Sequence, residues 1–168
     1  MSKLINGLRN PMGRIYLDSN ILIDLIIGGT AAKADAKREL YRIRSSYQIF
    51  IPQIILGESF SMVLHKSETH DRDKNMTDFW KCIEDIIKDT AKHTPPLRPE
   101  ILEVALEIGK NDYKLDHNDA VLVAHVVTDK ESTALFTSDQ GIHNSKPIKD
   151  LVNQRRIEGN PIKVLDSI

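Results

Sequence analysis

The stretch RIYLDSNILIDLII at residues 14–27 decides the fold class, because it joins a short strand directly to a short helix. Residues 14–17 are rich in apolar side chains and end at Asp18, which predicts a β-strand. Residues 21–27 form an apolar run that stops at Gly28, which predicts a short helix. An acidic side chain therefore lies at the point where the first strand becomes the first helix.

The same alternation of strand and helix continues along the chain. We expect further strands over residues 47–51, 133–137 and 162–165, and helices over residues 30–44, 53–65, within 71–92, 100–108, 118–128 and 149–156. Strands that alternate with helices in this way are typical of a parallel sheet covered by helices. The sequence therefore predicts an α/β fold, a three-layer α/β/α sandwich with a mostly parallel central sheet.

One of these helices carries a long apolar stripe at helical spacing. The stripe predicts an amphipathic helix and consists of Met76, Phe79, Trp80, Ile83, Ile86 and Ile87. It is either part of the hydrophobic core or a groove for a second protein. The single cysteine, Cys82, lies on the same helix, and we expect it to pack rather than to react.

Length and composition indicate one folded domain. The chain has 168 residues, of which 40% are hydrophobic and 28% are charged, with 8 glycines and 7 prolines. These values exclude a disordered or a collagen-like chain. We expect an N-terminal leader over residues 1–13 and a single domain over residues 14–168. The presence of only one cysteine excludes an internal disulfide and a multi-cysteine zinc site.

The charge of the chain is close to balanced. Lys and Arg number 23 and Asp and Glu number 24, which gives a formal net charge of −1. A strongly basic nucleic-acid-binding domain is therefore excluded, and any contact with nucleic acid needs a local basic patch or a bound cation. No apolar segment reaches the ~18 residues of a membrane span, and no secretory signal is visible. We therefore expect a cytoplasmic protein without membrane contact.

Four carboxylates stand at positions where chemistry is plausible. Asp18 and Asp139 each follow a predicted strand, at the sheet edge where α/β proteins bind ligands. Glu58 shares a helix face with apolar residues, and Asp119 lies in the first turn of an apolar helix. Taken alone, each acid also fits a helix cap, a turn or a solvent-facing rim.

Together the four acids predict a cation site. All four could point into one cleft, where carboxylates repel one another unless a proton or a cation relieves the repulsion. A site made only of oxygen ligands suits Mg²⁺ or Mn²⁺. Such a metal can polarise a phosphodiester and lower the pKa of a bound water. It would also supply positive charge for an anionic substrate.

The order of these motifs resembles that of the PIN-domain ribonucleases. Residues 15–24, IYLDSNILID, are similar to the first motif of the family, in which Asp-x-Asn lies between hydrophobic residues. The later acidic motifs of the family are similar to Glu58, to Asp119-Ala120 and to Thr137-Ser138-Asp139. The likeness covers residues 15–165 and identifies the single domain as a PIN-like nuclease domain.

The resemblance implies a metal-dependent endoribonuclease that hydrolyses RNA phosphodiesters. By that likeness, the catalytic residues are also the ligands of Mg²⁺ or Mn²⁺, namely Asp18, Glu58, Asp119 and Asp139. Asn20 and Thr137 would position the metal-bound water or the carboxylates. Asp116 would act as a helix cap first and as a metal ligand second. No binding site for an organic cofactor is implied.

The resemblance also implies partners. Many small members of the family are the toxin halves of VapBC toxin–antitoxin pairs, so we expect an RNA substrate, an antitoxin protein and a homodimer. The extra leader and the polar residues 67–75 depart from a minimal toxin. A stand-alone RNA-processing nuclease is therefore the first alternative, and a non-catalytic module of the same fold that binds protein or RNA is the second.

Other chemistries fit the sequence less well. Haloacid-dehalogenase phosphatases need a second aspartate two residues after the first, where this chain has Asn20. No histidine pair has His-x-x-x-His spacing, and Gly28-Gly29 lacks the Lys-Ser/Thr of a P-loop. Two basic clusters have side chains that could contact an RNA backbone: Lys33, Lys37, Arg38, Arg42 and Arg44, and Lys146, Lys149, Arg155 and Arg156.

Overall fold

A parallel sheet forms the centre of the fold. The computed structural model describes residues 13–87 and 93–166, so residues 1–12 of the expected leader lie outside the described residues. Within these ranges the strands are β1 (Arg14–Leu17), β2 (Gln48–Phe50), β3 (Ser132–Phe136) and β4 (Lys163–Leu165). They pair in the order β2-β1-β3-β4, and every pair is parallel. The predicted parallel sheet is confirmed.

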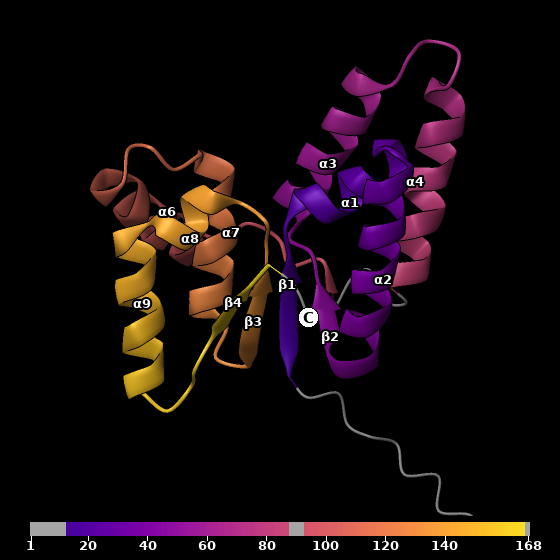
Figure 1. The fold of residues 1–168 in the computed structure, drawn as a ribbon. Coiled ribbons are helices and arrows are strands. Elements are labelled where there is room, and N and C mark those ends of the chain that lie inside the picture. Colours follow the sequence, from indigo (N-terminus) through magenta and orange to yellow (C-terminus); the bar gives the residue numbers. More distant parts are fainter. Residues whose placement is uncertain (1–12, 88–92, 167–168) are drawn as a thin grey trace, which may run out of the picture.

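Helices lie on both sides of the strands. They are α1 (Ser19–Ile27), α2 (Thr30–Ser46), α3 (Gln53–Lys66), α4 (Arg72–Ile86), α6 (Pro99–Asn111), α7 (His117–Thr128), α8 (Gln140–Asn144) and α9 (Lys146–Ile157). Figure 1 shows the strands between α1–α4 on one side and α6–α9 on the other. The predicted three-layer α/β/α sandwich is therefore confirmed. None of the helices within the described ranges is long and apolar enough to span a membrane.

Two predicted helix boundaries are wrong, and one helix was not predicted. The helix expected over residues 100–108 does not end before Gly109, because α6 runs on to Asn111 and a Cβ at Gly109 would meet open space. The helix expected from residue 149 begins at Lys146, with Pro147 in the first turn, a position that proline favours. The sequence reading also missed α8, because five residues are too few to show a helical period.

The hydrophobic core surrounds β1, which lies between two other strands. Its residues Ile15 and Leu17 are fully buried, as expected for a central strand covered on both faces. The apolar stripe of α4 also faces this core through Phe79, Ile83 and the residues that follow. Trp80 is the exception, because 59% of its surface is exposed.

Cys82 packs partly into the same core, as expected. Burial raises the pKa of its thiol to about 11, and the neighbouring charge of Asp85 acts in the same direction. The thiol is therefore protonated at neutral pH, which makes it a poor nucleophile.

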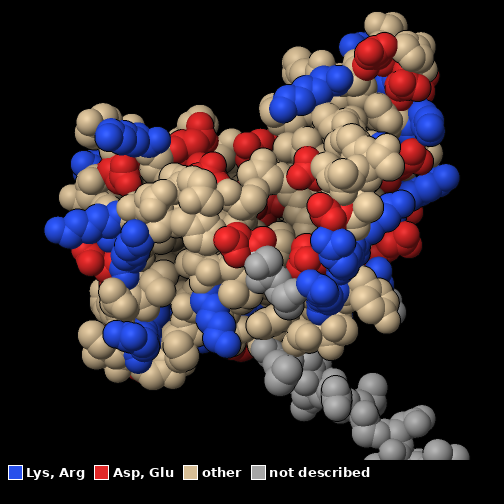
Figure 2. Space-filling model, viewed as in Figure 1, with Lys and Arg blue, Asp and Glu red and all other residues tan. Residues whose placement is uncertain are grey.

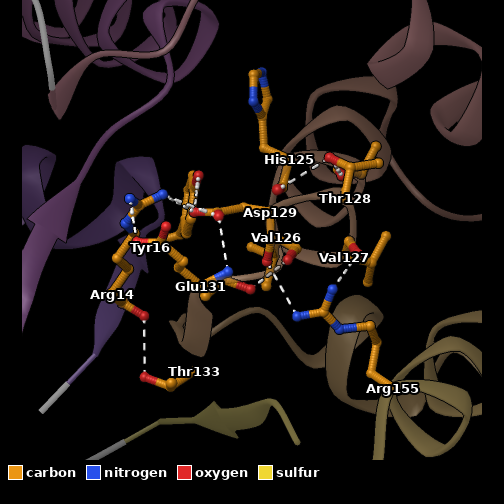
Figure 3. Close-up of polar contacts among 12 residues, drawn as sticks. Arg14, Tyr16, His125, Val126, Val127, Thr128, Asp129, Glu131, Thr133 and Arg155 are labelled. Atoms are coloured by element: carbon orange, nitrogen blue, oxygen red, sulfur yellow. Dashed lines mark hydrogen bonds and ion pairs between the residues drawn. The ribbon is translucent and has the colours of Figure 1, made fainter. Parts of the chain in front are cut away.

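A polar network lies at the edge of the sheet where the strands begin. Arg14 donates two hydrogen bonds to Asp129, at 3.0 and 3.1 Å, and the hydroxyl of Tyr16 donates a third at 3.0 Å (Figure 3). Arg155 of α9 donates to the carbonyl oxygens of Val127 and Asp129 at 3.0 and 3.1 Å. These contacts tie the end of α7 to β1 and α9.

Candidate active site

The candidate acids lie at the edge of the sheet where β1, β3 and β4 end. The backbone N–H of Asp18, just after β1, donates to the carbonyl of Phe136 at the end of β3, at 3.1 Å. Just after β3, the N–H of Thr137 donates to the carbonyl of Leu165 in β4, at 2.9 Å. Because the carboxyl ends of parallel strands meet along one edge, Asp18 and Thr137 become neighbours although 119 residues separate them.

Asp18 is almost completely buried and fully hydrogen-bonded. Its Oδ1 accepts from the backbone N–H and the hydroxyl of Ser19, at 2.5 and 3.2 Å. Its Oδ2 accepts from the side chains of Asn20, at 3.2 Å, and Thr137, at 2.6 Å. Only 3% of Asp18 is exposed, and burying a carboxylate is costly unless donors surround it in this way. Asn20 and Thr137, both predicted as supporting residues, therefore contact Asp18 directly.

Glu58 approaches Asp18 from α3 and is partly buried. Burial raises the pKa of its carboxyl, and the negative charges of Asp18 and Asp116 raise it further. Hydrogen bonds from the side chains of Ser19 and Asn118 act in the opposite direction. Glu58 thus shares Ser19 with Asp18 and is linked to the first turn of α7 through Asn118.

Asp119 lies in the first turn of α7 and is the most perturbed of the acids. Burial raises its pKa to about 7, and four other carboxylates raise it as well: Asp18, Asp139, Asp116 and Glu58. The predicted acids are therefore close enough in space to repel one another. Asp116 serves as the N-cap of α7, because its Oδ1 accepts from the N–H of Asn118 at 2.8 Å.

Asp139 caps α8 and belongs to a tight turn after β3. Its backbone N–H donates to the hydroxyl of Thr137 at 3.0 Å, and its Oδ1 accepts from the N–H of Gly141 and Ile142. The ring of His143 hydrogen-bonds the carbonyl of Thr137 at 3.0 Å. Sequence reasoning missed Ser19, Asn118, Gly141 and His143, because their roles depend on contacts that spacing does not show.

The acids surround a hollow in the molecular surface. Figure 2 shows acidic side chains gathered between the projecting α3–α4 pair and the helices of the other side, and the strands of Figure 1 point toward this hollow. A cavity of about 280 Å³ adjoins Asp18 and is lined by further acids. These are Asp24, Asp35, Glu39 and Asp166. Glu58, Asp119 and Asp139 do not line this cavity.

The donor set of the site fits a divalent cation. Carboxylate oxygens are the ligands that Mg²⁺ and Mn²⁺ prefer. Burial raises the pKa of Asp119 first, and the neighbouring negative charges, which a cation would offset, raise it further. Within residues 13–87 and 93–166, however, no three His, Cys, Asp or Glu side chains already converge as a metal site. Binding a cation would therefore require the carboxylates to draw together.

Comparisons with known proteins agree with the fold. The family model described as the PIN domain matches residues 15–146. No curated protein sequence matches the chain.

Two solved structures have similar folds. The VapBC2 structure from Rickettsia felis, bound to a DNA fragment from its promoter, aligns with a TM-score of 0.59 and 16% identity over 91% of this chain and 99% of that chain. The FitAcB structure from Neisseria gonorrhoeae aligns with a TM-score of 0.53 and 14% identity over 89% of this chain and 96% of that chain. At these identities, the likeness establishes the fold alone.

Proposed function

Because the chain belongs to the PIN-domain family, we propose that it is an Mg²⁺- or Mn²⁺-dependent endoribonuclease whose acids form the metal site. PIN domains are generally nucleases that act on phosphodiesters, and they generally use divalent metal ions. One observation carries the proposal for this chain. Burial, and then the charges of four neighbouring carboxylates at the carboxyl edge of the sheet, raise the pKa of Asp119 to about 7.

Asp18, Glu58, Asp119 and Asp139 would hold the cation. When bound, it would supply Lewis-acid polarisation of the phosphodiester and a more acidic water. The chain's own contribution is to hold the acids in place before the substrate arrives. Asn20 and Thr137 fix Asp18, and Ser19 and Asn118 orient Glu58. Asp119 keeps its proton up to about pH 7 and would release it when a cation binds.

The charges around the site would favour the binding of RNA only when that cation is present. The hollow is acidic, and two basic residues of α2 are already paired with acids. Arg38 contacts Asp35 at 2.8 Å, and Arg42 contacts Glu39 at 3.2 Å. A polyanion would therefore meet negative charge at the metal-free site. The bound cation would provide the local attraction that RNA needs.

We also propose that the protein is the toxin of a toxin–antitoxin pair, with an antitoxin as its partner and a homodimer as its assembly. The observation that favours this role is the likeness of the fold to chains of the VapBC2 and FitAcB structures along nearly their whole length. A stand-alone RNA-processing nuclease remains the alternative. Expression in a host should arrest growth, and Asp119→Asn should not. Equal growth with both forms would contradict the toxin role.

The nuclease proposal is tested by removing one carboxylate at a time. We expect Asp18→Asn, Glu58→Gln, Asp119→Asn and Asp139→Asn each to abolish RNA cleavage in Mn²⁺ while the far-UV circular dichroism spectrum stays unchanged. Glu103→Gln, on the exposed face of α6, is the matched control and should cleave like the parent protein. Full RNase activity in Asp119→Asn would contradict the mechanism. A rise in Tm with Mn²⁺ but no cleavage of any RNA would favour a non-catalytic binding module.

A further inference from the structure

The turn that carries Asp139 is fixed at both ends. At its start, the hydroxyl of Thr137 donates to Asp18 and accepts from the N–H of Asp139. At its end, the ring of His143 returns to the carbonyl of Thr137 at 3.0 Å. The backbone of residues 137–143 is therefore tied to the same buried carboxylate around which the candidate site is built. The conformational freedom that remains to Asp139 is therefore that of its side chain.

The side chain of Asp139 is held through one of its two oxygens. Oδ1 accepts from the N–H of Gly141 at 2.5 Å and from the N–H of Ile142 at 3.2 Å. The hydrogen bonds described for this carboxylate all use Oδ1, so they leave Oδ2 available to a ligand. The two capping hydrogen bonds therefore fix the orientation of the Asp139 carboxylate.

These capping bonds leave no room for a side chain at position 141. A Cβ added to Gly141 would lie 2.7 Å from Oδ1 of Asp139, a separation that real Cβ atoms essentially never show. Cδ1 of Leu115 would lie 3.8 Å away, at ordinary van der Waals contact. A residue larger than glycine at 141 must therefore turn the Asp139 carboxylate away from its capping position.

We propose that Gly141 is a positioning residue of the metal site, because its missing side chain lets Asp139 cap α8 through Oδ1 and present Oδ2 to the cation. The inference rests on the proposed metal-dependent function. It predicts that metal binding is sensitive to a single methyl group at a position that has no side chain of its own to bind the metal. Groups that orient metal ligands typically change metal affinity by about 10- to 100-fold when they are altered.

The chain offers a matched control for this substitution. Gly109 also lies inside a helix, α6, but a Cβ there would have no atom within 4 Å. Gly109→Ala therefore adds the same methyl group and the same helix propensity without touching the candidate site.

The experiment compares Gly141→Ala and Gly109→Ala with the parent protein. In EDTA, we expect both variants to be folded, with the Tm of Gly141→Ala close to that of the parent, because the lost capping bonds and the gained helix propensity act in opposite directions. In a titration with Mn²⁺ alone, followed by Tm, we expect Gly141→Ala to need at least about tenfold more Mn²⁺ than Gly109→Ala. RNA cleavage should fall in the same order.

A double-mutant cycle tests whether Gly141 acts through Asp139. In an Asp139→Asn background, Gly141→Ala should have no further effect on the Mn²⁺ titration. Equal Mn²⁺ binding by Gly141→Ala and Gly109→Ala would overturn the inference and leave the proposed function standing. Unfolding of Gly141→Ala in EDTA would also overturn it, because the role would then be structural. A parent protein that neither responds to Mn²⁺ nor cleaves RNA would overturn both proposals.

Discussion

The carboxyl group of Asp119 holds its proton more tightly in the folded protein than in the unfolded chain. Its pKa rises from 3.8 to about 7, first through burial and then through the neighbouring carboxylates. Between about pH 4 and pH 7 the unfolded chain loses this proton while the folded protein keeps it. The free energy of unfolding therefore decreases as the pH rises through that window, and above pH 7 Asp119 destabilises the metal-free protein.

Asp119→Asn should consequently stabilise the protein while it abolishes cleavage. At pH 8 in EDTA we expect a gain of about 1 kcal/mol, or a Tm roughly 2–4 °C higher, after allowance for solvent screening of a partly exposed group. Near pH 4 the difference should disappear. Asp78→Asn, at an exposed position of α4, is the control and should change little. A variant less stable than the parent protein at pH 8 would contradict the raised pKa of Asp119.

His125 should have the opposite dependence on pH. It is only 3% exposed, and burial, followed by the charge of Arg98, lowers its pKa to about 4. As the pH falls from about 6.5 to 4, the unfolded chain takes up a proton that the folded protein refuses, so stability is lost by up to about 3 kcal/mol. His125→Phe should remove this acid sensitivity, as urea unfolding at pH 7.5, 5.5 and 4.5 would reveal. If His125→Phe lost as much stability at low pH as the parent protein, His125 would not be the cause of the acid sensitivity.

The sequence could predict which acids lie near one another but not how they are held. Asp18 and Asp139 follow strands, and strand ends in an α/β protein share one edge, so their proximity follows from the alternation of elements alone. The role that we propose for Gly141 could not be predicted, because it depends on a distance of 2.7 Å between the Cβ that glycine lacks and Oδ1 of Asp139. Ser19 and Asn118 escaped notice for the same reason, since both are ordinary capping-type residues in a sequence.

At the scale of elements, long periodic segments were predictable and short ones were not. The helix predicted over residues 53–65 is α3 to within one residue, because its apolar period is long enough to identify. On α4, periodicity placed Trp80 in the apolar stripe that was either core or a groove, and the structure exposes Trp80 to solvent beside the buried Phe79. Periodicity indicates which face of a helix is apolar. Tertiary packing decides how many residues of that face are buried.

Helix α9 shows how a charge in a basic cluster can be structural. Arg155 was one of the residues expected to be available to RNA, but it is 7% exposed and donates to three backbone carbonyls, of Asn160, Val127 and Asp129. It joins the end of α7 to the loop after α9, so it cannot contact RNA without unfolding. The expectation that Arg155 could contact an RNA backbone is therefore wrong.

Arg155→Lys should destabilise the protein without a direct effect on RNA binding. A lysine cannot reproduce the planar set of donors, so buried carbonyls lose their partners, at a cost of about 3 kcal/mol. Arg156→Lys, at the exposed neighbouring position, is the matched control and should be nearly neutral. Midpoints of urea unfolding measure the difference. Equal midpoints for the two variants would mean that the network at this edge of the sheet contributes little.

For the whole molecule, the near-neutral charge and the acidic hollow have one consequence for substrate binding. The formal net charge is −1, and acidic side chains gather in the hollow toward which the strands point (Figures 1 and 2). Without a cation, the phosphates of RNA would approach a site of like charge, so long-range attraction cannot bring the substrate to it. A bound divalent ion changes the sign of that local interaction without altering the rest of the surface.

Binding of RNA should therefore depend on divalent cations more strongly than on the basic surface residues. Fluorescence anisotropy with a labelled RNA, in EDTA and then with Ca²⁺, which also takes oxygen ligands, measures binding at constant ionic strength. We expect the affinity to rise at least about tenfold with Ca²⁺, equivalent to roughly 1.4 kcal/mol, and Asp18→Asn to cancel the rise. Lys149→Ala, on the exposed face of α9, should leave it intact. An affinity that is equal in EDTA and Ca²⁺ but falls with Lys149→Ala would place RNA on the basic helix instead of at the acidic edge of the sheet.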